Sequence, residues 1–480
     1  MSQTRAMGWV RSVTGRKGDP IMSVPRLVVC GLESGPSVAL AAGALSVCFG
    51  DQRAVRAVTI GLDLPLWQLL SASAAKAPRV LDLALHDDDT AAELCASWAA
   101  GCELLLLVGV EPVLDRWQGV KGSRAVDIAA GLDAPLLLVV DARDRGPTAA
   151  AAVFGVRALA KRVEIAGVIL VGGEDHGRGA DLAASVRSDA GLPIVGWIPQ
   201  RLSEQFARDY GVTFGAMGHM GSRPVEGGVQ RLCVEAATYL QLDEIDAAAA
   251  RRGFLPGRPR RLLTPAPAAT GLTLAVAWGP PLEPIGLENV DLLKAMGLSL
   301  SPFNATVDRE LPPDTSGLLL AGQLDQDQLS GFAANGELQA CLAAAIGDGL
   351  PTLALGGGAL LLLRRLADAR GRSHELAGVL PAEAELLDVY ERPRYVNARA
   401  ARENPYDEGE NVLYELFDLE YLVLELESYA YHVGDPGEAR QAEGFALGRC
   451  LATTLFLSLP RCPGLAARFV DAMRLAGPCA

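Results

Sequence analysis

Residues 26–48 read RLVVCGLESGPSVALAAGALSVC, and this stretch decides the fold. Its apolar run Arg26–Cys30 has the length and the β-rich composition of a buried strand. The glycine-containing segment Gly31–Gly35 follows directly, and the small apolar residues from Ser37 to Cys48 then suit a helix. We therefore expect a strand, a tight turn and a helix, the repeating unit of a parallel α/β sheet.

The same unit recurs through the first half of the chain. Short, continuously apolar runs alternate with longer helical patterns, which is typical of a parallel sheet covered by helices on both faces. Further strands are expected at Val55–Ile60, Leu104–Val108, Pro135–Val140, Ile165–Val171 and Pro193–Trp197, and helices at Arg124–Gly131, Thr148–Arg162 and Gly179–Asp189.

A proline- and arginine-rich stretch interrupts this pattern at residues 247–271, which contain the basic run Arg251–Arg261. Such composition favours a linker between domains. A basic patch that contacts a membrane or a polyanion is the alternative. The expected organisation is therefore a disordered extension at 1–21, a first domain at 22–246, the linker at 247–271 and a second domain at 272–480.

The second domain is predicted to be α/β as well. The acid-rich stretch Glu403–Glu443 suggests strands that carry an acidic outer face, with an apolar run at Tyr421–Leu424. Strands are expected at Leu272–Trp278, Ser299–Phe303, Leu318–Leu320, Thr352–Leu355 and Leu376–Leu380, with a helix at Gly286–Ala295.

Composition narrows the range of functions. The net charge of −14 argues against a nucleic-acid interface, which needs a basic face. The nine cysteines lack any CxxC pair or zinc-like spacing with histidine, so they are expected as reduced thiols and not as metal ligands. No run approaches the roughly 18 apolar residues of a membrane span. The basic N-terminus lacks the apolar core of a signal peptide, so we expect a cytoplasmic protein.

Several short motifs occur in a fixed order between Val24 and Ala476. Together they resemble the cobyrinic acid a,c-diamide synthase family, and the order is more specific than any one motif. The motifs are Pro25–Val29, Gly61–Asp63, Leu81–Asp82, Leu107–Asp115, Ala134–Asp141 and Ile165–Leu170 in the first half, and Leu287–Val290, Gly349–Pro351, Ala377–Pro381 and Cys462–Val470 in the second.

The resemblance implies a function for each domain. In this family an N-terminal P-loop-type domain activates a tetrapyrrole carboxylate with ATP, and a C-terminal class I glutamine amidotransferase domain supplies ammonia. It also makes a homodimer plausible. The expected fold class is accordingly α/β with two domains, a P-loop-NTPase-like parallel sheet followed by a glutamine-amidotransferase-like domain.

The phosphate-binding residues of the family are missing from this chain. Val38 stands at the position of the phosphate-binding lysine, and Ala39 stands at that of the magnesium-binding hydroxyl. Glu33 adds negative charge to the loop, and Pro36 removes a backbone donor. The acidic residue of the family's VEG motif is replaced by Val108. We therefore expect neither ATP nor magnesium to bind in the family manner, and no other cofactor.

The amidotransferase half lacks its nucleophile. Gly356 occupies the cysteine position in the run Ala354–Gly358, and the closing segment Thr453–Leu459 contains no histidine. Glycine cannot attack an amide, so glutamine hydrolysis through a thioester should be absent. Leu413–Phe417 keeps the glutamate of a family strand as Glu415 but has no histidine. His432 is predicted on a surface loop, and Cys341 and Cys450 are predicted to be buried thiols rather than substitute nucleophiles.

Eight residues remain candidate ligand contacts. Gly31, Ser34 and Gly35 could cradle an anion or form a plain turn between strand and helix. Gly357 and Gly358 could form an anion-binding nest or a tight joint left from an ancestral elbow. Asp63, Asp82 and Asp115 stand at family positions near the carboxyl edge of the sheet, where they could contact a cation or the rim of a bound ring, or cap helices and turns.

We interpret the chain as a degenerate family member, a pseudoenzyme that binds a tetrapyrrole of the cobalamin or siroheme type as a carrier or scaffold. Two alternatives stay open. One is an amidating enzyme that uses free ammonia or a partner subunit. The other is an interaction module that pairs with an active paralogue and binds no ring.

Overall fold

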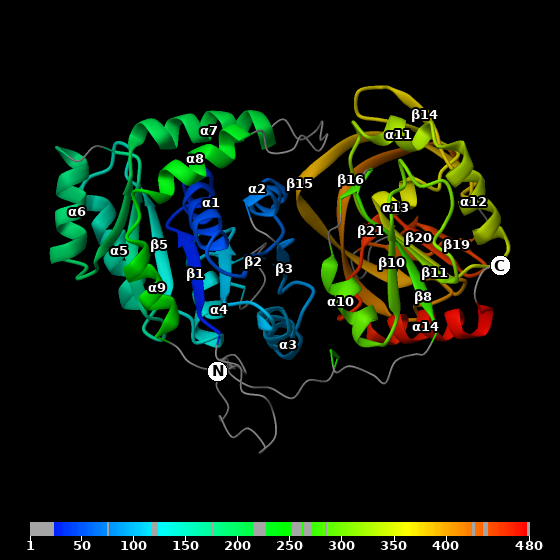
Figure 1. The fold of residues 1–480 in the computed structure, drawn as a ribbon, viewed down its shortest axis with the longest axis horizontal. Coiled ribbons are helices and arrows are strands. Elements are labelled where there is room, and N and C mark those ends of the chain that lie inside the picture. Colours follow the sequence, from blue (N-terminus) through cyan, green and yellow to red (C-terminus); the bar gives the residue numbers. More distant parts are fainter. Residues whose placement is uncertain are drawn as a thin grey trace, which may run out of the picture. The chain divides into compact units, whose positions relative to one another are not determined.

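In a computed structural model of the chain, the described residues are 24–73, 76–116, 123–173, 176–214, 227–251, 262–263, 271–279, 281–283, 286–424, 428–434 and 440–477. They form two compact units, the first from the described residues up to 251 and the second from those after 261 (Figure 1). The predicted extension 1–21 and most of the predicted linker lie outside the described residues. Residues 247–250 of that linker belong to a helix, and the domain boundaries stay a prediction.

The first unit is built on a seven-stranded sheet in the order β3-β2-β4-β1-β5-β6-β7. Every pair in it is parallel, as predicted. The three-residue strand β3 at one edge was not predicted, because so short a run carries little pattern. The strands are β1 Arg26–Gly31, β2 Val55–Ile60, β3 Arg79–Leu81, β4 Leu104–Gly109, β5 Leu136–Asp141, β6 Ile165–Val171 and β7 Ile194–Ile198.

Helices cover both faces of this sheet (Figure 1). α1 contacts α2, α7 and α8 on one face. A Cβ atom on Gly43 of α1 would lie 2.7 Å from Sγ of Cys233 in α8, so glycine allows these two helices to approach closely. The helices are α1 Pro36–Gly50, α2 Leu64–Ser73, α3 Asp88–Ala99, α4 Ala125–Gly131, α5 Pro147–Leu159, α6 Arg178–Ser188, α7 Gln200–Phe214, α8 Gly227–Ala237 and α9 Leu242–Ala250.

The second unit contains a second sheet of mainly parallel strands, in the order β10-β8-β11-β12-β20-β19. Only β19 at its edge and the short β9 pair antiparallel. The strands are β8 Thr273–Ala277, β9 Leu282–Glu283, β10 Ser299–Phe303, β11 Thr315–Leu324, β12 Thr352–Gly356, β19 Phe445–Leu447 and β20 Cys450–Thr453. The helices are α10 Leu287–Ala295, α11 Leu329–Ala333, α12 Gly336–Gly347, α13 Gly357–Leu360 and α14 Pro463–Ala476.

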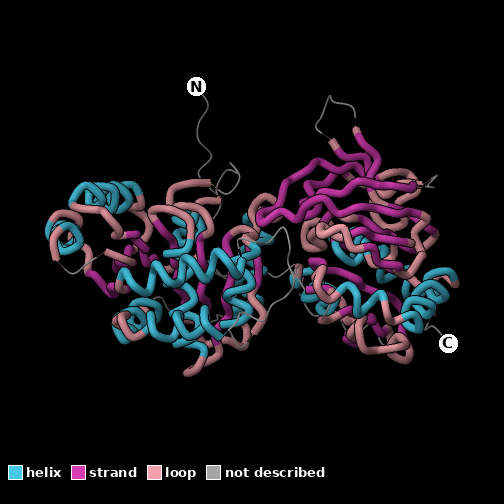
Figure 2. The backbone as a smooth tube through the Cα atoms, turned by 90° about the horizontal axis from the view of Figure 1, so that it is seen from above, coloured by secondary structure: helices cyan, strands magenta, loops and turns pink. Residues whose placement is uncertain are grey.

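A third sheet completes the second unit and contains two long antiparallel strands, β15 and β16, visible in Figure 2. The predicted strand Leu376–Leu380 is wrong, because its backbone amides donate to the carbonyls of residues 361–364 and not to a neighbouring strand. The strands are β13 Arg365–Ala367, β14 Ser373–Glu375, β15 Ala382–Ala400, β16 Glu410–Leu424, β17 Tyr431–Val433, β18 Gln441–Glu443 and β21 Leu455–Phe456.

Asn289 of α10 ties this helix to the segment after β21. Its Nδ2 donates to the carbonyl of Leu457 at 2.9 Å, and its Oδ1 accepts from the amide of Leu459 at 2.6 Å. Replacing it by alanine leaves a buried carbonyl and a buried amide without their partner, so we expect Asn289→Ala to lower the free energy of unfolding by about 1–3 kcal/mol in urea denaturation.

The exposed Lys294 on the same helix provides the control. Lys294→Ala should change the free energy of unfolding by no more than about 0.5 kcal/mol. Equal effects of the two variants would contradict this role for Asn289.

Candidate functional site

The turn between β1 and α1 is tight and depends on glycine at two positions. A Cβ atom on Gly31 would lie 2.1 Å from the carbonyl oxygen of Glu33 and 2.6 Å from Cγ2 of Val38. Gly35, the N-cap of α1, has φ 123°, a conformation that favours glycine. Pro36 then occupies the first turn of the helix. The turn is thus compact, and Ser34 lies exposed on its outside.

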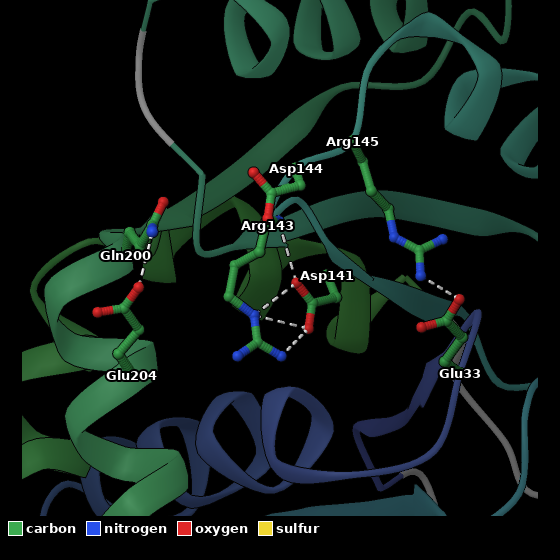
Figure 3. Close-up of a pocket in the computed structure, with 7 residues that line it drawn as sticks. All are labelled: Glu33, Asp141, Arg143, Asp144, Arg145, Gln200 and Glu204. Carbon is green, nitrogen blue, oxygen red and sulfur yellow. Dashed lines mark hydrogen bonds and ion pairs between the residues drawn. The ribbon is translucent and has the colours of Figure 1, made fainter.

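A charged pocket of about 380 Å³ lies beside this turn, at the carboxyl edge of the sheet (Figure 3). Ligands of open α/β sheets bind at this edge, where the direction of winding reverses. The pocket is lined by Glu33 after β1, by Asp141, Arg143, Asp144 and Arg145 at and after the end of β5, and by Gln200 and Glu204 at the start of α7.

Internal ion pairs and hydrogen bonds hold the pocket together (Figure 3). Asp141 accepts from Arg143, whose Nε lies 3.0 Å from Oδ1, and from the hydroxyl of Ser37 at 3.1 Å. Arg145 pairs with Glu33. The α1 turn and the β5 loop are therefore joined by their own side chains.

Of the two glycines after β6, Gly172 makes room for Arg143 and Gly173 makes room for Ala142. Gly172 has φ 75°, and a Cβ atom there would lie 2.4 Å from Cγ of Arg143. Gly173 has φ 69°, and a Cβ atom there would lie 2.8 Å from the carbonyl oxygen of Ala142. The stem of Arg143 thus lies across the end of β6, in space that a side chain would otherwise fill.

The electrostatics of the pocket keep both Asp141 and Arg143 charged. Burial raises the pKa of Asp141, but hydrogen bonds from Arg143 and Ser37 together with the Arg143 charge outweigh burial, so the pKa lies below its ordinary value. The hydrogen bond from Arg143 to Asp141 in turn raises the pKa of Arg143.

These residues do not fit a magnesium–triphosphate group. The lining carries four carboxylates against two guanidinium groups, which disfavours a polyanion. Val38, which stands where the family has its phosphate-binding lysine, is buried, with 5% of its surface exposed. Within the described part of the chain, no group of three or more histidine, cysteine, aspartate or glutamate side chains could hold a metal ion.

The three candidate aspartates follow neighbouring strands of the same sheet but do not line the pocket. Asp63, Asp82 and Asp115 come after β2, β3 and β4, on the other side of β1 from the pocket. Oδ1 of Asp63 accepts from the amide of Leu66 at 3.0 Å, and Oδ1 of Asp82 accepts from Ala84 at 2.8 Å. Those two side chains therefore stabilise a helix start and a turn, whereas Asp115 lies exposed.

The strand-to-helix joint of the second unit has the shape of an elbow and no space for a side chain at its tip. Gly356 ends β12 with φ 62°. A Cβ atom there would lie 2.0 Å from Cε2 of Phe456, so that it would overlap the edge of the ring. A Cβ atom on Gly357 would lie 2.7 Å from the amide of Leu324, and one on Gly358 would lie 2.0 Å from the carbonyl oxygen of Leu320. The three glycines thus pack directly against β11 and β21.

Phe456 is held in place by an aromatic stack. Its ring lies parallel to that of Tyr414 on β16, with centroids 5.2 Å apart, and Tyr414 meets Tyr395 of β15 edge-on at 6.5 Å. The rings close the elbow from the side of the third sheet.

Glu443 is a half-buried acid that bonds to Thr453, the residue paired with Leu355 of β12, and to Thr454. Glu443 accepts from the hydroxyl of Thr453 at 2.6 Å and from both the amide and the hydroxyl of Thr454 at 2.9 Å. Burial of its carboxyl raises the pKa of Glu443 in spite of these hydrogen bonds. Burial likewise raises the pKa of the half-buried Glu415 on β16.

The other groups weighed as catalytic residues are not at the elbow. Cys450 is buried on β20, as predicted, and burial raises its pKa to about 12. Cys341 is only half-buried, on the outer helix α12, so its prediction as a buried thiol is corrected. His432 is exposed as predicted, but it belongs to the strand β17 and not to a loop.

The pocket around Asp141 was missed by sequence reasoning. Asp141 directly follows the predicted strand Pro135–Val140, and an acid at that place is a signal of the right kind for a carboxyl-edge site. Its partner Arg143 and the nearby Arg145 have no local signature, and Gln200 and Glu204 come from distant sequence. The glycine pair Gly172–Gly173 was the only other local signal.

Comparison with known proteins agrees with this architecture. No family model matches the chain. The cobyrinate a,c-diamide synthase of Dehalococcoides mccartyi strain CBDB1 is 26% identical over 471 residues, covering 94% of this chain and 98% of that protein. The hydrogenobyrinate a,c-diamide synthase of Thermobifida fusca is 27% identical, covering 96% and 99%. The cobyrinate a,c-diamide synthase of Gloeobacter violaceus is 30% identical, covering 63% and 65%.

The fold and the two glycine-rich joints define a two-domain α/β protein, with a P-loop-NTPase-like parallel sheet first and a class I glutamine-amidotransferase-like domain second. Its sequence relatives then indicate a particular family within this class. Relatives named cobyrinate and hydrogenobyrinate a,c-diamide synthase, 26% and 27% identical and covering 94% and 96% of this chain, support this family. None of the helices among the described residues is long and apolar enough to cross a membrane.

A cysteine restored at position 356 should collide with the ring of Phe456. We expect Gly356→Cys to lower the free energy of unfolding by about 1–3 kcal/mol beyond the backbone cost of a positive φ, measured by urea denaturation, and to release no glutamate from glutamine. Gly371→Cys is the matched control, since Gly371 has φ 75° and open space around it. Equal destabilisation by both variants would contradict the overlap with Phe456.

The Asp141–Arg143 pair should make stability depend on pH. Because the pKa of Asp141 is lowered on folding, its charge stabilises the native state at neutral pH, and this contribution is lost as pH falls below about 4. The gap in unfolding free energy between wild type and Asp141→Asn should therefore be largest at pH 7 and shrink in acid. Asp144→Asn, at an exposed neighbour, should show little change. A gap for Asp141→Asn that widens in acid would refute the pair's role.

Proposed function

We propose that this protein binds a tetrapyrrole of the cobalamin or siroheme type without ATP- or glutamine-dependent amidation. The observation that carries the proposal is the position of Phe456, whose ring fills the space that a side chain on Gly356 would need. A class I amidotransferase attacks glutamine from that position, and a glycine there offers no nucleophile. The closing segment Thr453–Leu459 also contains no histidine that could act as the base.

The charges of the first unit support the same proposal. Family chemistry would require a triphosphate beside the β1–α1 turn, where this chain gathers Glu33, Asp141, Asp144 and Glu204. Ser37, the hydroxyl on the first turn of α1, is already bonded to Asp141. ATP would have to displace these contacts and then meet excess negative charge.

The tetrapyrrole is inferred from two sources. The relatives are named for acting on cobyrinate and hydrogenobyrinate. In addition, Asp63, Asp82 and Asp115 follow three adjacent strands at one edge of the sheet. The carboxylates of the protein can accept hydrogen bonds from the amide side chains of a ring, whereas they repel carboxylate side chains on it. We therefore expect an amidated ring to bind more tightly than its carboxylic acid form.

A titration of the full-length protein tests the proposal. With siroheme, cobyrinic acid or its a,c-diamide added, we expect a saturable change in the absorption spectrum, strongest for the diamide. Calorimetry with ATP and magnesium should show no heat of binding, and glutamine should not be hydrolysed. An amidated product in the presence of ammonia or of a partner subunit would favour the amidating alternative. The absence of a spectral change for every ring would reject tetrapyrrole binding.

Among the three aspartates, Asp115 offers the cleanest variant, since Asp63 and Asp82 also hold turns. We expect Asp115→Asn to weaken ring binding by about tenfold, which corresponds to the loss of one charge-assisted hydrogen bond. Asp189→Asn, at the C-cap of α6, is the control and should leave the affinity unchanged. Unchanged affinity for Asp115→Asn would remove Asp115 from the binding site.

A further inference from the structure

The outer face of the β15–β16 pair carries two pairs of like charges that directly oppose each other. In the strand register, Glu385 faces Glu420 and Asp388 faces Asp418. Three of these acids are exposed and Glu385 is half-buried. Side chains directly opposite each other on neighbouring strands lie about 5 Å apart, so like charges there destabilise the sheet.

Among the described residues, no basic side chain neutralises these four carboxylates. None of them forms an ion pair with any residue that the structure describes, whereas their neighbours are paired: Glu383 with Arg365 at 2.5 Å, and Glu415 with Arg394 at 3.6 Å. The charge on Glu385, Asp388, Asp418 and Glu420 is therefore left for solvent or for a partner.

Two β-bulges place leucines among these acids. On β15, Leu387 has no partner on the opposite strand, although Leu386 and Asp388 on either side of it are paired. On β16, Leu422 likewise has no partner, although Tyr421 pairs with Ala384 and Val423 pairs with Glu383. Both extra residues are leucines that lie in solvent, with 48% and 47% of their surfaces exposed. Bulges redirect side chains and recur near functional surfaces. The Glu385–Glu420 pair lies between the two leucines along the strands.

We propose that this surface, formed by Glu385, Leu387, Asp388, Asp418, Glu420 and Leu422, docks a basic segment of a partner protein in which arginine or lysine alternates with apolar side chains. Charge complementarity selects this partner. The cations would neutralise the opposed acid pairs, and the apolar residues would cover the two leucines. A second copy of the same acidic face would repel it, and so would an anionic membrane surface.

The test uses a labelled, end-capped peptide of alternating leucine and arginine, with fluorescence anisotropy on the full-length protein in about 0.15 M salt. Control peptides replace arginine by citrulline or leucine by serine. We expect saturable binding that needs both residue types. Two variants should each weaken binding about tenfold or more. The first, the face variant, combines Glu385→Gln, Glu420→Gln, Asp388→Asn and Asp418→Asn. The second combines Leu387→Ser and Leu422→Ser.

A matched charge control removes four exposed acids elsewhere in the same unit, by Glu310→Gln, Asp348→Asn, Glu375→Gln and Glu403→Gln. This variant should bind the peptide within about a factor of two of wild type. If it weakens binding as much as the face variant does, the attraction is only that of a net negative protein and the proposal is wrong. Absence of peptide binding to wild type also overturns it.

Thermal unfolding provides a second readout that does not depend on the peptide. Because the opposed acids destabilise the sheet, neutralising all four should raise Tm, and the matched control should not. A fall in Tm for the face variant would mean that the acids serve the fold, and would overturn the proposal. A dimer in sedimentation analysis that is lost in the leucine variant would assign the face to a second copy and would equally overturn it.

Discussion

The contact between Gly356 and the ring of Phe456 constrains the rest of the second unit. A residue with φ 62° at the end of β12 allows the chain to turn sharply into α13, and only glycine leaves room for the ring. Phe456 in turn stacks on Tyr414, so the parallel sheet and the long β15–β16 strands are joined at the elbow. The geometry that would carry a nucleophile is thus kept, while the space for the nucleophile is used for packing.

In the first unit, charged side chains rather than aromatic rings occupy the space beside the turn. The β1–α1 turn keeps the compact shape of a phosphate-binding loop, but Asp141, Arg143 and Ser37 bond one another where a ligand would otherwise bind. Gly172, directly after β6, accommodates the stem of Arg143. In both units, side chains from distant parts of the chain pack beside a glycine-containing turn between a strand and a helix, and these contacts stabilise the turn.

The fold was predictable because it depends on local patterns. The apolar strand β1, the glycine turn and α1 could be read from one stretch, and the repeated unit then implied the parallel sheet. The site was predictable only in part. Val38 and Gly356 indicated what was lost, but Phe456 and Arg143 act through contacts between residues far apart in sequence, and no local periodicity reports those. The misplaced strand at Leu376–Leu380 has a similar cause, since its backbone amides donate to the carbonyls of the loop after α13.

The central claim is that no nucleophile serves the amidotransferase-like domain. The most direct measurement is incubation of the full-length protein with a diazoketone analogue of glutamine, which alkylates a reactive cysteine at such a site, followed by mass mapping of every cysteine peptide. The account predicts no adduct on any cysteine, including the buried Cys450 and the half-buried Cys341. A stoichiometric, glutamine-protectable adduct on one cysteine would contradict it.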